Sequence, residues 1–91
     1  MLESEIEKRL VKLVREAGGR AYKFVSPGNV GVPDRIVVLP GGRIWFVELK
    51  TETGRISPAQ ERQLETMKSL GANVFVLRGV DGLRTFKGVI K

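Results

Sequence analysis

The sequence contains no cysteine and no histidine among its 91 residues. The lack of cysteine excludes disulfides and thiolate-bound zinc. The lack of histidine excludes histidine general bases, histidine metal ligands and the Ser-His-Asp triad. Any metal ion must therefore be held by oxygen ligands, which favours Mg²⁺ or Mn²⁺ over zinc.

Long apolar runs are also absent, and none approaches the roughly 20 residues that a membrane-spanning helix needs. The first residues include several glutamates, a composition that does not fit a secretory signal. We therefore expect a protein that is neither secreted nor bound to a membrane, working in the cytoplasm of a bacterial or phage-infected cell. The length predicts a single stand-alone domain over residues 1–91, with a core small enough to keep dimerisation open.

Basic residues outnumber acidic ones, 16 against 10, which gives a net charge of +6. A charge balance of this sign and size favours a polyanionic partner, and DNA is the partner we expect. The alternative is a protein that is basic and soluble with no nucleic-acid ligand.

Apolar spacing and capping residues predict three helices. Residues 3–17 form an amphipathic pattern that ends at Gly18-Gly19, and Ser57-Pro58 predicts the N-cap and first turn of a helix that reaches about Leu70. A short C-terminal helix is expected from the spacing of Leu83, Phe86 and Ile90. In the first two helices, the positions expected to face the core are Ile6, Leu10, Leu13, Val14, Ala17, Leu64 and Met67.

Strands are predicted at residues 20–25, 35–39, 43–50 and 73–77. The turn Pro40-Gly41-Gly42 indicates an antiparallel hairpin, and the apolar run IWFV indicates that its second strand is central. The helical crossover to the last strand predicts parallel pairing. The expected fold is α/β, with a mixed four-stranded sheet in the order α-β-β-β-α-β and a short C-terminal helix.

Asp34, Glu48 and Lys50 are the candidate catalytic residues. Glu48 and Lys50 are two apart on a strand and so share one face. Asp34 lies six residues before Pro40 and Glu48 lies six residues after Gly42, so hairpin register places the two carboxylates at one level. The plainer interpretation is an exposed ion pair at a strand end.

Two carboxylates at one site repel each other unless a cation neutralises them, and such a pair beside a lysine suits Mg²⁺ acting on a phosphodiester. The backbone carbonyl of Leu49 is expected to point toward the same ion. Lys50 is expected to hold or help deprotonate the attacking water and to offset charge on the phosphate.

Three segments resemble the VRR-NUC family, a branch of the PD-(D/E)xK nucleases: SPGNVGVPDR at 26–35, GGRIWFVELK at 41–50 and ISPAQ at 56–60. The resemblance implies a restriction-endonuclease-like core, Asp34 and Glu48 as metal ligands, and Lys50 as the catalytic lysine. It also implies a role for Gln60. That polar side chain lies on the core-facing side of its helix and needs a partner. The partner is expected to be the site lysine or the substrate, and the alternative is that Gln60 only caps a local network.

Such nucleases often place a further acid on the first helix, which here is Glu3 by preference and Glu7 second. The alternative for both is a solvated charge near the positive helix N-terminus. Candidates for phosphate contacts lie near the proposed site in sequence, although each alone is ordinary surface polarity; they are Lys23, Ser26, Asn29, Arg35 and Arg55.

The leading hypothesis is a Mg²⁺- or Mn²⁺-dependent endonuclease, a hydrolase of structured or branched DNA and of four-way junctions in particular. It would act as a homodimer and need no small-molecule cofactor. The dimer interface is expected on helix faces or around Phe86, Val89 and Ile90, although these three could instead pack onto the sheet. The alternatives are a catalytically silent DNA-binding module and a nuclease acting on RNA or single strands.

Overall fold

Four strands pair in sequence order, β1-β2-β3-β4, in a computed structural model that describes all 91 residues. The pairs β1–β2 and β2–β3 are antiparallel, and the pair β3–β4 is parallel. The elements are α1 (Glu3–Glu16), β1 (Arg20–Lys23), β2 (Arg35–Leu39), β3 (Arg43–Lys50), α2 (Pro58–Ser69), β4 (Val74–Arg78) and α3 (Gly79–Val89), with a short 3-10 turn at Pro40–Gly42. The predicted α/β fold, its mixed sheet and its C-terminal helix are confirmed.

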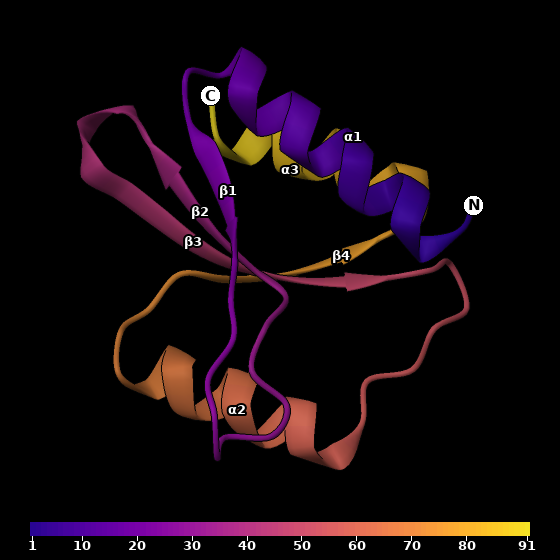
Figure 1. Cartoon of the computed structure of the whole chain (residues 1–91), viewed down its shortest axis with the longest axis vertical. Helices are drawn as coiled ribbons and strands as arrows, with labels where there is room; N and C mark the ends of the chain where they lie inside the picture. Colours follow the sequence, from indigo (N-terminus) through magenta and orange to yellow (C-terminus); the bar gives the residue numbers. More distant parts are fainter.

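The two faces of the sheet are covered by different helices (Figure 1). Helices α1 and α3 lie side by side on one face, and α2 lies on the other. The hydrophobic core fills the space between the sheet and the α1/α3 layer. Its members are Ile6, Leu10, Val14, Ala21, Val37, Leu39, Val47, Leu49, Leu77, Leu83, Phe86 and Ile90.

Some predicted boundaries were wrong by one or two residues. β1 ends at Lys23, not residue 25, because the chain turns into a long connection in which Val25 is exposed. α1 ends at Glu16, so Ala17 is its exposed C-cap and not a core residue. Of the other positions expected to face the core, Leu13 and Met67 are half-buried and the rest are buried.

The C-terminal helix corrects the expected dimer interface. Phe86 and Ile90 are buried in the core, and Phe86 packs against the rings of Trp45 and Phe75, with centroids 6.0 and 5.0 Å away. Of the three residues, only Val89 is exposed. Phe86 and Ile90 thus complete the core of their own chain.

The helices of this fold are all too short or too polar to span a membrane.

Candidate active site

Asp34 and Glu48 lie at one level of the sheet, as the hairpin register predicts. Arg35 of β2 pairs with Val47 of β3, so the next step of the antiparallel register brings Asp34 opposite Glu48. The Asp34 carboxylate is fixed there because its Oδ2 accepts a hydrogen bond from the backbone N–H of Leu49 at 2.7 Å. The two carboxylates therefore sit at neighbouring positions of adjacent strands.

The backbone carbonyl of Leu49 leaves β3 on the edge that faces Asp34, since the N–H and C=O of one strand residue point to the same neighbour. Continuing the register, the residue opposite Leu49 is Pro33, which is buried and has no N–H to donate. The proline therefore leaves this carbonyl without the ladder donor that another residue would supply.

Glu48 is buried, with an exposed side-chain fraction of 2%. Its Oε2 accepts a hydrogen bond from Gln60 Nε2 at 3.0 Å and lies 3.5 Å from Lys50 Nζ, whereas its Oε1 is buried with no partner. Burial, together with the negative charge of Asp34, raises the pKa of Glu48 to about 7, and Lys50 opposes part of that rise. A buried acceptor without a partner costs about 1–3 kcal/mol, which a ligand at this oxygen would relieve.

Gln60 reaches Glu48 because the start of α2 is held in place twice. Ser57 and Gln60 form a capping box, in which Gln60 N–H donates to Ser57 Oγ at 3.1 Å and Ser57 N–H donates to Gln60 Oε1 at 2.9 Å. The Gln60 side chain thus caps the helix with its oxygen and binds Glu48 with its nitrogen. The expected local cap is present, but the partner of Gln60 at the site is Glu48 and not the expected Lys50.

Gly31 holds the loop before Asp34 against the same helix. Its φ is +91°, and a Cβ at this position would lie 2.6 Å from the backbone carbon of Ala59 and 2.8 Å from Gln60 N. Only glycine combines this backbone angle with so close an approach. Gln63 Nε2 adds a 3.4 Å hydrogen bond to the carbonyl of Val30. The loop that carries Asp34 and the helix that carries Gln60 are therefore packed together.

Lys50 is half-buried at the end of β3, and its surroundings include two residues that no sequence pattern singled out. Arg78 is the register partner of Lys50 on β4, and its guanidinium donates to the carbonyl of Gly54. Gly54 in turn packs beside Lys50, since a Cβ there would lie 3.4 Å from the lysine Cδ. The two residues fix the loop that covers Lys50. No sequence signal pointed to them, because their contacts depend on the pairing of β3 with β4.

The two acidic candidates on α1 have different surroundings. Glu7 Oε2 lies 2.9 Å from Arg35 Nη2 and 3.6 Å from Lys23 Nζ, so Glu7 is held in a salt-bridge network beside the sheet. Glu3 is exposed, and its charge contributes to the raised pKa of Glu48. No group of three acidic side chains lies close enough to form a metal cluster. Of the two candidates, only Glu7 is therefore held by salt bridges.

The residues predicted to contact phosphate differ in how many bonds they already make within the protein. The Arg35 guanidinium is mostly buried and also donates to the Ala21 carbonyl at 2.9 Å, so any phosphate contact would compete with these bonds. Asn29 Nδ2 donates to Ser26 Oγ at 2.9 Å within an exposed turn, and Arg55 is exposed without an ion pair. Arg55 therefore has no competing side-chain bond, whereas Lys23, Ser26 and Asn29 each have one.

The donors at the site suit a hard divalent cation. Asp34 and Glu48 supply carboxylate oxygens, Leu49 supplies a carbonyl oxygen, and Glu48 Oε1 is buried without a partner. All of these donors are oxygens, the ligand type of Mg²⁺ and Mn²⁺, and a cation here would also offset the repulsion between two neighbouring carboxylates. The residues present thus fit such an ion.

Comparisons with known proteins agree with the fold. The family model described as "VRR-NUC domain" matches residues 1–81. A protein of Acyrthosiphon pisum secondary endosymbiont phage 1, named "Putative nuclease p44", is 52% identical over 79 residues, which cover 87% of this chain and 85% of the phage protein. A solved structure described as "VRR_NUC domain" superposes with a TM-score of 0.85 at 34% identity, covering 92% of this chain and 91% of that one. On its sequence and its fold alike, this chain belongs to the VRR-NUC family.

Proposed function

We propose that the chain is a Mg²⁺- or Mn²⁺-dependent endonuclease that hydrolyses phosphodiester bonds in DNA. One observation carries the proposal: the buried Glu48 keeps an unpartnered oxygen level with Asp34, with Lys50 Nζ 3.5 Å from its other oxygen. A buried carboxylate with a second carboxylate beside it stabilises no fold by itself, because burial and like-charge repulsion both penalise its charge. A cation bound by the carboxylates and a phosphate beside the lysine would offset these charges.

Each residue has a defined task in this proposal. Asp34, Glu48 and the Leu49 carbonyl would hold the ion, which when bound supplies Lewis-acid stabilisation of the phosphate. Gln60 fixes Glu48 through one oxygen, and the other oxygen, which has no protein partner, would bind the ion. Lys50 is positioned to hold the attacking water and to offset negative charge that builds on the phosphate in the transition state. Glu3, the α1 candidate without a salt bridge, would contribute a further oxygen through bound water.

The relatives support the nuclease part of the proposal. The phage protein with 52% identity carries the word nuclease in its name, and the family model spans the segments that hold all the proposed site residues. The source of that relative also supports a bacterial or phage-infected cell as the place of action. The net charge of +6 fits a DNA substrate.

The preferred substrate in this proposal is structured or branched DNA, with the four-way junction as its most specific form. A domain of this size carries one site and little surface for recognition. A two-fold symmetric homodimer would present two sites in a fixed relation, which matches the near two-fold symmetry of a junction. Since Phe86 and Ile90 are in the core, the dimer contact must use other surface.

A cleavage assay tests the function directly. Purified protein is incubated with linear, flap and four-way DNA and with single-stranded DNA and RNA, in Mg²⁺, in Mn²⁺ and in chelator. We expect metal-dependent cuts, strongest in the four-way DNA. The matched variants are Glu48→Gln, which should be inactive, and Glu65→Gln on the exposed side of α2, which should be active.

Other results would replace the proposal. Binding of DNA with no cleavage in either metal would identify a silent binding module, and preferential cleavage of RNA or single strands would identify a different nuclease. Sedimentation at micromolar concentration tests the dimer separately: a species of 10.1 kDa that still makes paired cuts in a junction would contradict it.

A further inference from the structure

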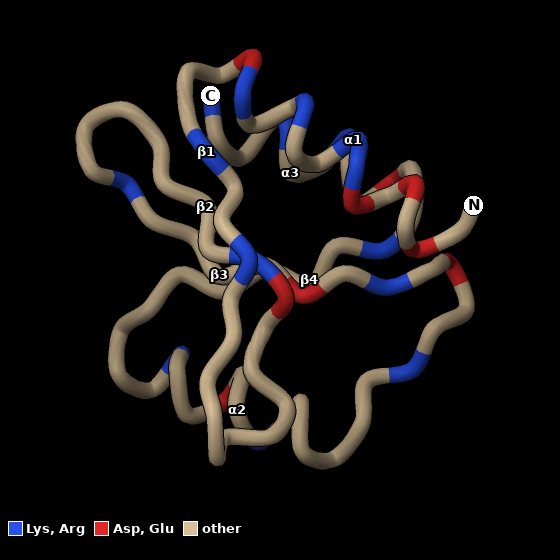
Figure 2. Tube along the Cα trace, viewed as in Figure 1, with Lys and Arg blue, Asp and Glu red and all other residues tan.

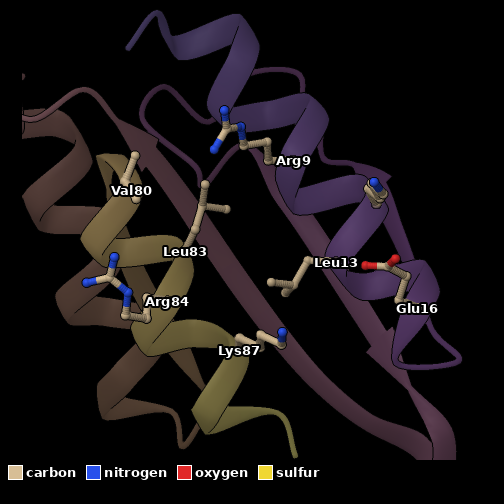
Figure 3. A pocket seen from close by; sticks show the side chains of 8 residues that line it. Arg9, Leu13, Glu16, Val80, Leu83, Arg84 and Lys87 are labelled. Atoms are coloured by element: carbon tan, nitrogen blue, oxygen red, sulfur yellow. The ribbon is translucent and has the colours of Figure 1, made fainter.

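A groove of about 570 Å³ runs between α1 and α3, away from the candidate active site (Figure 3). Leu13 and Leu83 line it, and in Figure 3 both side chains point into the space between the helices. Around them lie basic side chains from both helices, and Glu16 is the only acid. The basic lining residues, which we call the cationic groove, are Arg9, Lys12, Arg84 and Lys87.

The charges of the cationic groove are largely uncompensated. Arg9, Lys12 and Lys87 are exposed and make no ion pair and no side-chain hydrogen bond. Arg84 pairs with Asp81 at 3.3 Å, but their side chains are 76% and 94% exposed, so solvent and salt screen this pair. In Figure 2 acidic positions gather at the start of α1, and basic positions follow along the helix until the acidic position at its end; basic positions also mark the facing part of α3.

The cationic groove and the candidate active site lie on opposite sides of the sheet. Glu48 points toward α2, where it meets Gln60, whereas α1 and α3 cover the other face. The groove shares no lining residue with the site. A straight segment of nucleic acid held at Glu48 therefore cannot contact Lys12 and Lys87 through the intervening sheet.

We propose that the cationic groove binds the phosphate backbone of a second segment of the nucleic acid, outside the segment that is cut. The proposal rests on the proposed function and deepens it, because a branched substrate has arms beyond the one in the active site. Charge complementarity selects this occupant, since uncompensated cations on two sides of a groove suit a polyanion. A second copy of the chain is a poor occupant, because two-fold contact at this surface would place cations against cations.

The test measures DNA binding in chelator, so it needs no cleavage and stands apart from the outcome of the nuclease assay. The probes are a fluorescently labelled four-way DNA and anionic phospholipid vesicles, each titrated with the whole chain at several salt concentrations. The groove variant is Lys12→Glu with Lys87→Glu. The control is Lys8→Glu with Arg15→Glu, exposed residues of α1 outside the groove. Each pair has one position within a helix and one in a last turn, and the net charge changes equally.

We expect the groove variant to bind the four-way DNA at least about tenfold more weakly than the control, with a salt slope smaller by about 2, as the loss of two phosphate contacts requires. Thermal melting of both variants checks that the helices are intact. Equal weakening in the two variants would overturn the proposal, because charge alone would then explain it. So would unchanged DNA binding with loss of vesicle binding, which would assign the groove to a lipid surface.

Discussion

The two faces of the sheet are built for different purposes. The face under α1 and α3 holds the twelve-residue apolar cluster, whereas α2 contributes a single buried apolar residue, Leu64, to the other face. That second face carries the one buried charged residue, Glu48. Strand β3 serves both, because side chains alternate along a strand: Val47 and Leu49 enter the cluster while Glu48 and Lys50 point toward α2.

The contrast between the two faces shows how a small domain tolerates a site that destabilises its fold. A carboxylate with an unpartnered oxygen destabilises the fold, and such groups persist where the rest of the structure determines their position. Here the densely packed apolar face holds the backbone of β3 in place. The side chains on the polar face of the same strand are therefore held in position as well. Four predictions test this division of roles.

The largest expected effect is on catalysis and concerns the polar face. Asp34→Ala, Glu48→Ala and Lys50→Ala should each lower the rate of DNA cleavage by at least about 10³, because each removes an ion ligand or the charge beside the phosphate. Single-turnover cleavage of a junction measures the loss, and circular dichroism shows whether the fold remains. A Lys50→Ala protein that cuts at a near-normal rate would contradict the mechanism.

The next effect concerns stability and contrasts the two faces directly. Leu10→Ala removes a fully buried side chain of the apolar cluster and should cost about 2–5 kcal/mol of unfolding free energy. Leu64→Ala, outside that cluster, should cost less, because fewer core side chains surround it. Urea unfolding of both variants gives the two values. Equal losses would mean that the α2 face contributes as much to stability as the α1/α3 face.

The pH dependence of stability tests the cost of Glu48 itself. Since its pKa in the folded chain is about 7 and its ordinary value is 4.5, the folded state holds this proton more tightly than the unfolded state. The metal-free protein should therefore lose stability as pH rises from about 4.5 to about 7, by about 3 kcal/mol at most. Urea unfolding across this range measures the decline.

Two controls isolate Glu48 from other titrating groups. Glu48→Gln should remove the decline and leave the protein more stable than the wild type at pH 8, although inactive. Glu52 acts in the opposite sense, since backbone hydrogen bonds lower its pKa, and both proteins retain it. A wild-type protein whose stability does not fall between these pH values would show that Glu48 is well solvated.

The smallest effect is expected at the rim of the sheet. Lys23 Nζ lies 3.6 Å from Glu7, and its side chain is 69% exposed, so Lys23→Ala should cost no more than about 1 kcal/mol. Arg35→Ala should cost more, because Arg35 is mostly buried and holds both Glu7 and the Ala21 carbonyl. Thermal melts of the two variants rank them. The reverse order would show that the exposed lysine, and not the buried arginine, anchors Glu7.

Local sequence patterns were sufficient to predict the helices and strands, and to predict that Asp34 and Glu48 lie at the same level of the sheet. Periodicity, capping residues and turn residues act over a few neighbours, and the hairpin between β2 and β3 is joined by a turn at 40–42. Its register therefore follows from counting, and Asp34 came opposite Glu48 as expected. The same local logic identified Ser57 as the cap of α2 and the parallel return of β4.

Which polar groups bond to one another, and which apolar groups are buried, depends on the tertiary structure. The pairing of Glu7 with Arg35 spans 28 residues, the bond from Gln60 to Glu48 spans 12, and that from Arg78 to Gly54 spans 24. Phe86 and Ile90 belong to the core, and the cationic groove exists, because α3 folds back beside α1. Such contacts depend on how whole helices pack against the sheet, which the spacing of residues along the chain does not encode.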